Sequence, residues 1–410
     1  MIVKSKSETG IDVLTHLFAF ISILLIGADK WGVNVGVNLR LDQIFLVIVA
    51  ILIFMKSDFI VYKNISLIGF VFFTLLSVVF AFDPIRSMLY YFSIVYNVFF
   101  VFLTFANYVK IYGIERFISI FRKTCYVQFF VLAIQFLLKV FFDFEFSFLP
   151  GYGQYLGIYR FSLWFYEPSY LATYLVFWLT LSLSMSLIGK DLTYIADIIL
   201  CLIMLVISTS SSGFLGICLS LFIVYLFWVF RGITKWKLLF LLIPITLFLV
   251  FRFRFPSIYN TFVSRIFAGD LNASSGGRVE QWTETWNVFK DNACFGIGPG
   301  NYGAYLNKEN TYVPSNVTLE LLATTGIFST ICYVALNISL IVRPIKDYCK
   351  NRHDKKKIIT MSLGISLLVF VVILQINQGY LRLYHWMFMG VIFGLLKSSQ
   401  TNLAKNKIMK

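Results

Sequence analysis

The chain has little charge and few side chains suited to metal binding or disulfide formation. Only 13% of its 410 residues are charged, whereas soluble domains have about a quarter. It has three histidines and six cysteines, and no spacing among them is typical of a metal site. The long polar segment at 252–315 contains one cysteine, Cys294, so no disulfide within it is expected. These features argue against a soluble enzyme and against a metal centre.

Apolar sequence dominates instead. Hydrophobic residues make up 59% of the chain, and apolar runs near the length of a bilayer crossing recur from Ile11 to Leu396. We therefore predict an all-α, polytopic integral membrane protein, with one membrane domain over residues 1–410 and about 12 transmembrane helices. The predicted spans are 11–27, 41–55, 64–82, 87–108, 117–141, 167–188, 192–208, 213–230, 236–252, 316–342, 358–378 and 383–397.

Positive charge is divided unequally between the two sides of the predicted membrane. The segments on the side of the termini hold 23 of the 35 Lys and Arg residues, although the other side contains the longest loop. The positive-inside rule therefore predicts both termini in the cytoplasm and the long loop outside. Since the positive charges lie in short loops, the net charge of +15 gives no indication of nucleic-acid binding.

Two predicted outer loops, 143–166 and 252–315, are long enough to cover an active site. Polar side chains escape lipid burial there, so we expect the function of the protein to depend on these loops. In the longer loop, Val279, Trp282 and Trp286 recur at helical spacing. The pattern predicts an amphipathic helix at the outer membrane surface, either as a platform for a lipid-linked substrate or as a plain interfacial anchor.

Three arginines lie on the outer side at the membrane margin: Arg160, Arg265 and Arg278. Arg278 opens the predicted amphipathic helix, where a guanidinium beside free helix amides forms an anion site. As a set, the three suit recognition of a pyrophosphate or an acidic sugar. Each one singly is also explained by contact with lipid headgroups or by a structural ion pair.

Glu167 stands directly before Pro168 at the start of a predicted span. An acid at the mouth of a membrane cavity is a good candidate for a general base. The alternative is that Glu167 only complements the helix dipole. Glu280, on the predicted amphipathic helix, is the second candidate acid.

Four residues are candidates for substrate binding. They are Trp282, Trp286, Tyr302 in the glycine-rich segment GIGPGNYG, and Asn316 at the start of the next span. Aromatic rings offer flat apolar faces to sugars. For Asn316, a helix N-cap is the simpler interpretation.

Four segments together resemble the O-antigen polymerase and O-antigen ligase superfamily of bacterial envelope glycosyltransferases. They are Arg160 with FYEPSYLATYL, the turn STSSSG, the stretch SGGRVEQWTETWNVFKDNACFGIGPGNY, and SNVTLELLATTG. The predicted topology, with its two large outer loops, is similar too. The resemblance implies a GT-C-like fold in the bacterial cytoplasmic (inner) membrane. It also implies glycan transfer from undecaprenyl pyrophosphate at the outer face, without a nucleotide sugar, metal or other cofactor.

Within this superfamily, ligases typically carry a histidine just before the asparagine that opens the span after the long loop. Here that position is Ser315, which favours a polymerase of lipid-linked oligosaccharide repeat units, as in O-antigen or capsule synthesis. The implied partners are the lipid-linked oligosaccharide, membrane lipid and a polysaccharide chain-length regulator. The alternatives are a ligase that transfers glycan to lipid A core, and a flippase or transporter.

On the polymerase hypothesis, the candidate residues fall into two groups. Those assigned to catalysis are Glu167, Arg160, Arg278 and Glu280. Those assigned to substrate binding are Arg265, Trp282, Trp286, Asn316 and Tyr302.

Overall fold

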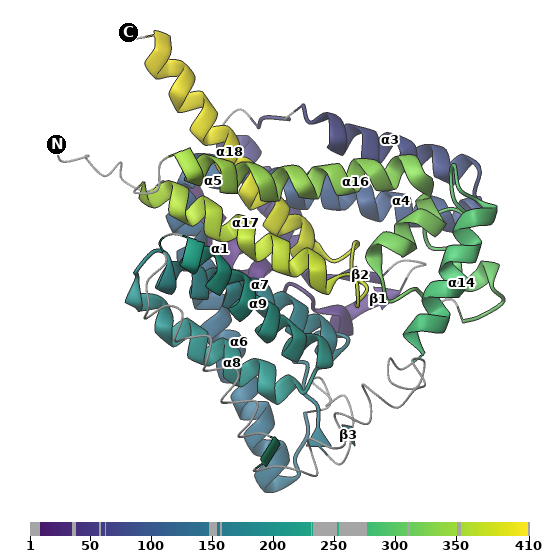
Figure 1. Ribbon diagram of the computed structural model, residues 1–410, viewed down its shortest axis with the longest axis horizontal. Helices are drawn as coiled ribbons and strands as arrows, with labels where there is room; N and C mark the ends of the chain where they lie inside the picture. Colours follow the sequence, from purple (N-terminus) through teal and green to yellow (C-terminus); the bar gives the residue numbers. More distant parts are fainter. Residues whose placement is uncertain are drawn as a thin grey trace.

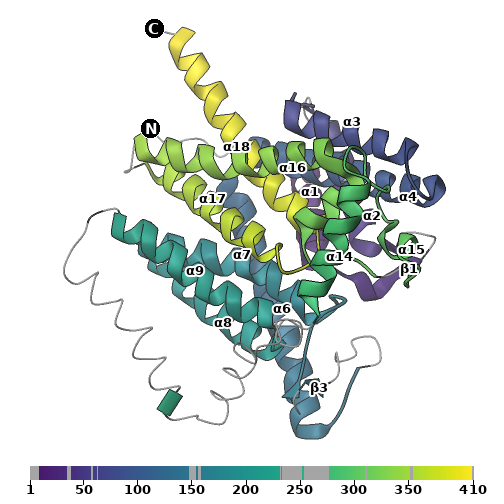
Figure 2. The same ribbon diagram turned by 45° about the vertical axis from the view of Figure 1, so that its right-hand side comes forward.

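The protein is almost entirely helical in the computed structural model (Figures 1 and 2). The structure describes residues 9–34, 38–56, 59–61, 63–146, 154–155, 158–230, 232, 252–253, 277–309, 312–350 and 354–408.

The first half of the chain contains α1 (Gly10–Leu24), α2 (Leu41–Lys56), α3 (Ile65–Val79), α4 (Pro84–Tyr96), a π-helical segment η2 (Asn97–Phe102), α5 (Leu103–Tyr112), α6 (Ile114–Phe142), α7 (Pro168–Leu187), α8 (Ile195–Ser208) and α9 (Ser211–Phe230). The second half contains α14 (Arg278–Asp291), α15 (Tyr302–Tyr305), α16 (Val317–Lys350), α17 (Lys355–Ile373) and α18 (Leu383–Ile408). Two short 3-10 helices are η1 (Asp29–Trp31) and η3 (Leu192–Tyr194).

The described residues form two small antiparallel β-hairpins. Strands β1 (Gly32–Asn34) and β2 (Asn38–Arg40) pair with Val33 opposite Leu39. Strands β3 (Gln154–Tyr155) and β4 (Ile158–Tyr159) pair in the segment before α7. The first hairpin connects α1 to α2, so it lies at one end of the helix bundle.

Described helices occupy eleven of the twelve predicted spans, and the remaining one, 236–252, lies outside the described residues except for Arg252. Within the described part of the chain, six helical segments are long and apolar enough to cross a membrane: Pro84–Tyr112, Ile114–Phe142, Pro168–Leu187, Ser211–Phe230, Val317–Lys350 and Lys355–Ile373. The described helices are thus consistent with the predicted polytopic membrane protein. The number of twelve spans stays a prediction.

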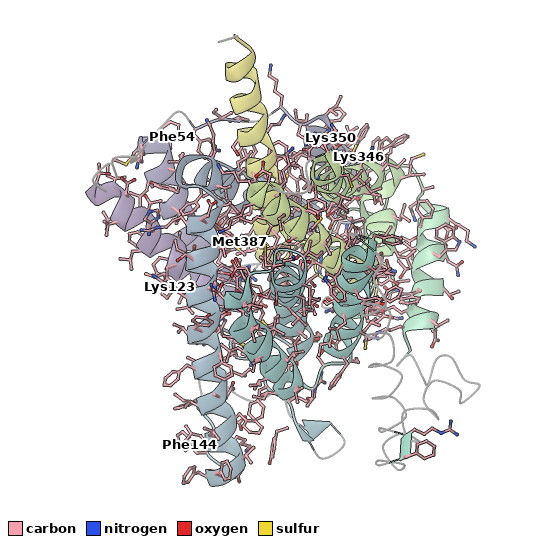
Figure 3. All side chains as sticks on the ribbon, turned by 60° about the vertical axis from the view of Figure 1, so that its left-hand side comes forward. Phe54, Lys123, Phe144, Lys346, Lys350 and Met387 are labelled. Carbon is pink, nitrogen blue, oxygen red and sulfur yellow. The ribbon has the colours of Figure 1, made fainter. Side chains whose placement is uncertain are left out.

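Helix α7 forms the centre of the bundle and packs against α8, α9 and α17. It is buried around nearly its whole circumference, as expected for a helix surrounded by other helices. The ring of Phe177 stacks on that of Phe388 from α18, with centroids 3.6 Å apart. Figure 3 shows Met387 within this packed interior, whereas Phe54 and Phe144 lie at the periphery. Large exposed apolar side chains such as Phe54 suit contact with lipid.

Helix α16 is interrupted at Gly326, whose backbone angles (φ 76°, ψ 177°) are not helical. The interruption leaves main-chain groups of α16 without helical partners, and the segment after α14 supplies them. Ile297 N donates to the oxygen of Ala323 at 3.0 Å, and Gly298 N donates to that of Thr324 at 2.8 Å. Irregular backbone within a membrane bundle is tolerated where protein groups satisfy it. The GIGPG segment therefore docks α14 onto α16.

Both chain termini lie at the end of the bundle opposite α14 (Figure 1). The β1–β2 hairpin and the connection between α17 and α18 lie at the α14 end (Figure 1). We call this end the mouth of the bundle. Helix α14, which belongs to the long predicted outer loop, lies at the mouth, and the orientation of the chain in the membrane stays a prediction.

Candidate functional site

Charged side chains from three distant parts of the chain meet at the mouth. We call Asp29, Arg40, Tyr170 and Arg382 the mouth cluster. Arg382 Nη1 lies 2.6 Å from Asp29 Oδ2, and Arg40 pairs with the other oxygen of the same carboxylate. The guanidinium carbon of Arg382 also lies 3.7 Å from the centroid of the Tyr170 ring. The cluster thus joins η1, the β1–β2 hairpin, α7 and the segment before α18.

The charges of the mouth cluster are mutually stabilised. Burial tends to raise the pKa of Asp29, but Arg382 and Arg40 outweigh it and hold that pKa below its ordinary value. Burial likewise opposes the charge on Arg382, yet Asp29 and nearby tyrosines hold its pKa above the ordinary value. Both groups therefore stay charged at neutral pH. Arg40 Nε also lies 3.3 Å from Asp42 Oδ1, so the two guanidiniums face two carboxylates and their formal charges cancel. An anionic ligand would have to compete with these carboxylates for the guanidinium donors.

Lys30 ties the hairpin region to the segment before α7. Its Nζ donates to Ser162 Oγ at 3.0 Å and to the oxygen of Leu163 at 3.1 Å. Burial lowers the pKa of Lys30 to about 8, although Glu145 and Asp29 act in the opposite direction. The contact fixes the end of the first predicted outer loop against the mouth.

Glu167, the first predicted catalytic acid, is half-buried directly before α7 and accepts a hydrogen bond from Ser169 Oγ at 2.9 Å. Its carboxylate does not cap the helix, although it occupies the N-cap position. Glu167 and Arg382 both act electrostatically on Tyr170, so Glu167 adjoins the mouth cluster. Glu280, the second predicted acid, is exposed on α14.

The predicted amphipathic helix is present as α14, but a partly polar face packs against the bundle. Thr285 and Val288 are its buried residues, while Trp286 is 44% exposed. Gln281 makes the main polar contact: its Oε1 accepts hydrogen bonds from the nitrogen and hydroxyl of Ser315, at 3.0 and 2.6 Å. Its Nε2 donates to the oxygen of Val313 at 2.9 Å. We call these bonds the Gln281 clasp, which fixes α14 over the start of α16.

Trp282 is half-buried beside this clasp. Its Nε1 is shielded from solvent and has no hydrogen-bond partner among the residues that the structure describes. The Trp282 donor is therefore unused among the described residues but not open to solvent, whereas the exposed ring of Trp286 offers an apolar face. Both substrate-binding roles stay predictions.

Two of the three predicted arginines lie in the described part of the chain. Arg160 is half-buried in the segment between β4 and α7, and Arg278 is half-buried as the first residue of α14. Gly277 before it has a left-handed conformation and gives α14 no side-chain cap. Arg265 lies outside the described residues, so a joint anion site of all three stays a prediction.

The structure assigns structural contacts to the other two predicted ligands. Asn316 Oδ1 accepts a hydrogen bond from Leu319 N at 2.9 Å, which is the N-cap role given above as the simpler interpretation. Tyr302 is buried, and its hydroxyl lies 2.7 Å from Thr285 Oγ1. This packing counts against the predicted contact of Tyr302 with substrate, because ring and hydroxyl are already enclosed by α14 and its neighbours.

An apolar groove of about 550 Å³ lies beside the mouth cluster. Leu39, Arg40 and Ile44 line it from β2 and α2, and Phe92 and Tyr96 line it from α4. Arg40 is thus shared between the groove and the charged mouth. A molecule with an apolar chain and an anionic head matches this combination.

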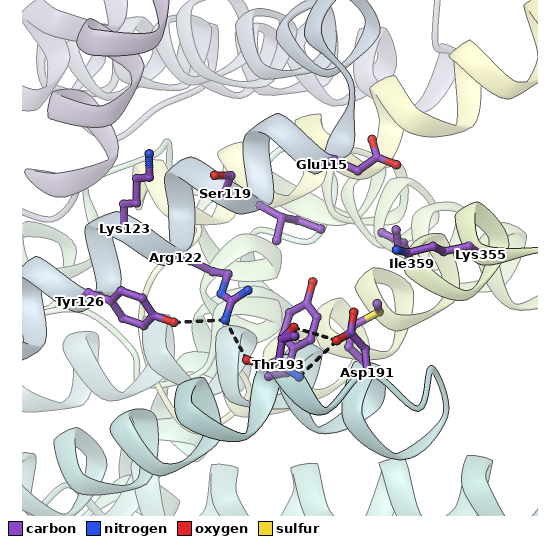
Figure 4. Close-up of a pocket in the computed structure, with 12 residues that line it drawn as sticks. Glu115, Ser119, Arg122, Lys123, Tyr126, Asp191, Thr193, Lys355 and Ile359 are labelled. Carbon is purple, nitrogen blue, oxygen red and sulfur yellow. Dashed lines mark hydrogen bonds between the residues drawn. The ribbon is translucent and has the colours of Figure 1, made fainter. Parts of the chain in front are cut away.

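A second cavity, of about 400 Å³, lies between α6, η3 and the start of α17 (Figure 4). Arg122 lines it and donates to Tyr126 Oη at 3.1 Å and to the oxygen of Thr193 at 2.8 Å. Arg122 is also paired with Asp197 at 2.9 Å. These contacts hold α6 to the segment before α8, and the cavity is separate from the mouth.

The mouth cluster was missed by the sequence interpretation. Arg40 and Arg382 enter the sequence analysis only as two of the Lys and Arg residues counted for orientation, and Asp29 is not singled out, since no motif connects the three. A usable signal was present: charged residues at the ends of apolar spans, as in GADKWG and GYLRLYHW, are costly in a membrane protein and mark interior sites.

Comparison with known proteins gives matches to part of the chain, and the family match does not include the mouth cluster. A family model described as O-Antigen ligase matches residues 197–334, which include α14, the Gln281 clasp and the first half of α16. The chain is 28% identical over 130 residues to the teichuronic acid biosynthesis protein TuaE of Bacillus subtilis (strain 168). That match covers 30% of this chain and 27% of TuaE. Both matches support the predicted resemblance to the O-antigen polymerase and ligase superfamily, and the chain spans about a quarter of the length of TuaE.

Proposed function

We propose that the protein is a polymerase of lipid-linked oligosaccharide repeat units for a bacterial surface polysaccharide. It transfers the growing glycan from undecaprenyl pyrophosphate to a hydroxyl of an incoming repeat unit, at the outer face of the cytoplasmic membrane. The released product is undecaprenyl pyrophosphate. The family match over residues 197–334 supports glycan transfer in general, and TuaE is named for teichuronic acid biosynthesis.

The geometry of the mouth supports a lipid pyrophosphate as the donor. The apolar groove between α2 and α4 has space for part of a polyprenyl chain, and Arg40 at its edge leads to Arg382. Fixed cationic groups stabilise the charge that develops on a departing pyrophosphate. Since arginines are present where this charge would form, we propose transfer that requires no metal ion.

The residue at position 315 is the reason for proposing a polymerase rather than a ligase. At the position where ligases typically have a histidine, its hydroxyl donates to Gln281 Oε1 at 2.6 Å. A serine held in this way fixes α14 and is a weak proton acceptor. The ligase is the second candidate function, because the matching family model is described as O-Antigen ligase.

The other residues keep the roles that the sequence predicts for them. Arg160 and Arg278 are assigned to anion binding, as is Arg265, which lies outside the described residues. Glu167 and Glu280 are the acids that the sequence assigns to proton transfer, with Glu167 first. Trp282 and Trp286 contact sugar from α14. A chain-length regulator would act at this same outer face.

Deletion of the gene in its host tests the polymerase assignment. Surface glycan is separated on a gel, and lipid-linked intermediates are extracted in parallel. A polymerase predicts surface acceptor carrying single repeat units. Full-length polymer that accumulates on the lipid carrier would instead indicate a ligase. Single repeat units trapped on the cytoplasmic face would indicate a flippase and refute both enzyme assignments.

A further inference from the structure

Glu320 is a buried acid that the roles given above do not use. It lies one turn inside α16, beyond the Asn316 cap, and is 7% exposed. Its Oε2 has no hydrogen-bond partner among the described residues. A buried carboxylate without a partner is destabilising, and leucine at this position would avoid the cost. Such an acid at the mouth of a membrane bundle indicates a functional role.

The groups around Glu320 connect it to the mouth cluster. Arg382 acts on it electrostatically. Tyr380, on the same segment between α17 and α18, has its pKa raised by burial and also by the charge of Glu320. Tyr333, further along α16, is also within electrostatic range. Among the described residues, these are the titratable neighbours, and Arg382 is the one with a positive charge.

A structural role explains only part of this arrangement. Glu320 lies in the first turn of α16, where an acid complements the helix dipole. An exposed acid would provide the same benefit without being buried. Asn316 already caps the helix, so α16 does not need a second group for this purpose. A structural role therefore does not account for the burial of Glu320 or for its unpartnered Oε2, and a role in the reaction does.

We propose that Glu320 takes the proton of the acceptor hydroxyl during glycan transfer. The acceptor oxygen forms a bond to the anomeric carbon of the donor, while the bond from that carbon to the pyrophosphate oxygen breaks. The electron pair of the broken bond stays on the pyrophosphate, and the hydroxyl proton passes to the Glu320 carboxylate. This assignment rests on the proposed function and gives Glu320 the role for which the sequence alone favours Glu167. Glu167, at the rim, then contacts the acceptor sugar.

The test uses the purified full-length protein in lipid nanodiscs, with undecaprenyl-pyrophosphate-linked repeat units as substrate. Polymer formation is measured between about pH 5 and pH 9. Glu320→Gln should lower kcat by about 10²–10⁴-fold with little change in KM, and it should abolish the loss of activity at acidic pH. Glu167→Gln should keep that loss and raise KM. Glu115→Gln, at an exposed position near the termini, is the matched control and should behave as wild type.

Either of two results would overturn the proposal. One is a Glu320→Gln protein with wild-type kcat, and the other is a Glu320→Gln protein with a lower kcat whose activity still falls as the pH is lowered. Should Glu320→Gln not fold, Glu320→Asp decides the question. Because Glu320→Asp keeps a carboxylate, a lower kcat together with activity that still falls at acidic pH supports the proposal. A wild-type kcat in Glu320→Asp refutes it. A wild-type protein that forms no polymer would instead refute the proposed function, and the assignment of Glu320 would fall with it.

Discussion

The interruption of α16 allows a quantitative prediction for Gly326→Ala. The backbone angles at Gly326 (φ 76°, ψ 177°) lie in a region that is essentially restricted to glycine. A Cβ there would lie 2.2 Å from the main-chain oxygen of Cys294. Backbone strain costs about 1–3 kcal/mol, and a forced shift in a packed interior costs about 1–3 kcal/mol more. We therefore expect a free energy of unfolding lower by about 2–6 kcal/mol.

Unfolding of the purified protein in detergent, followed by the signal of its tryptophans, measures this loss. Gly10→Ala is the control, because a Cβ at Gly10 has nothing within 4 Å. Gly326→Ala should also lower polymer formation, since the segment that docks α14 onto α16 must move. A Gly326→Ala protein within about 0.5 kcal/mol of wild type would show that this docking does not hold α14 in place.

Three further changes test the mouth. Arg382→Lys should lower kcat/KM for polymer formation at least about tenfold, because lysine cannot stack on Tyr170 while forming a directed ion pair; unchanged kcat/KM would remove Arg382 from the site. Gln281→Leu should lower the free energy of unfolding by about 1–3 kcal/mol, because Ser315 loses its acceptor; unchanged stability would contradict the clasp. Lys30→Met tests the pH dependence of stability. The pKa of Lys30 in the folded protein is about 8, below the ordinary value of 10.5, so the free energy of unfolding of the wild type should rise with pH between these two values. The variant should lack this rise, and equal pH profiles in unfolding experiments would refute the burial of the Lys30 charge.

The helical framework was predictable because it depends on local composition. A segment such as Phe214 to Phe230 is apolar at nearly every position, and an apolar run of nearly bilayer length forms a helix regardless of its neighbours. The ends of α16 and α18 were less predictable. Both helices continue beyond their predicted spans, to Lys350 and Ile408, because polar residues with good helix propensity extend them past the apolar region.

The site was only partly predictable, because its parts are remote in sequence. The position of Glu167 at the mouth follows from its place before α7. The contact of Arg382 with Asp29 joins residues at opposite ends of the chain, and no periodicity encodes such a pairing. The sequence predicts that α14 lies with its aromatic face on the membrane surface. In the structure, Gln281 of α14 faces the start of α16, and Trp286 is partly exposed.

The most direct measurement is polymer formation by the purified protein in liposomes, with undecaprenyl-pyrophosphate-linked single repeat units as the only glycan substrate. The polymerase assignment predicts a ladder of longer glycans that remain on the lipid carrier, with undecaprenyl pyrophosphate released at each step. A protein that leaves the single units unchanged, yet transfers glycan once lipid A core is added, would contradict it and establish the ligase.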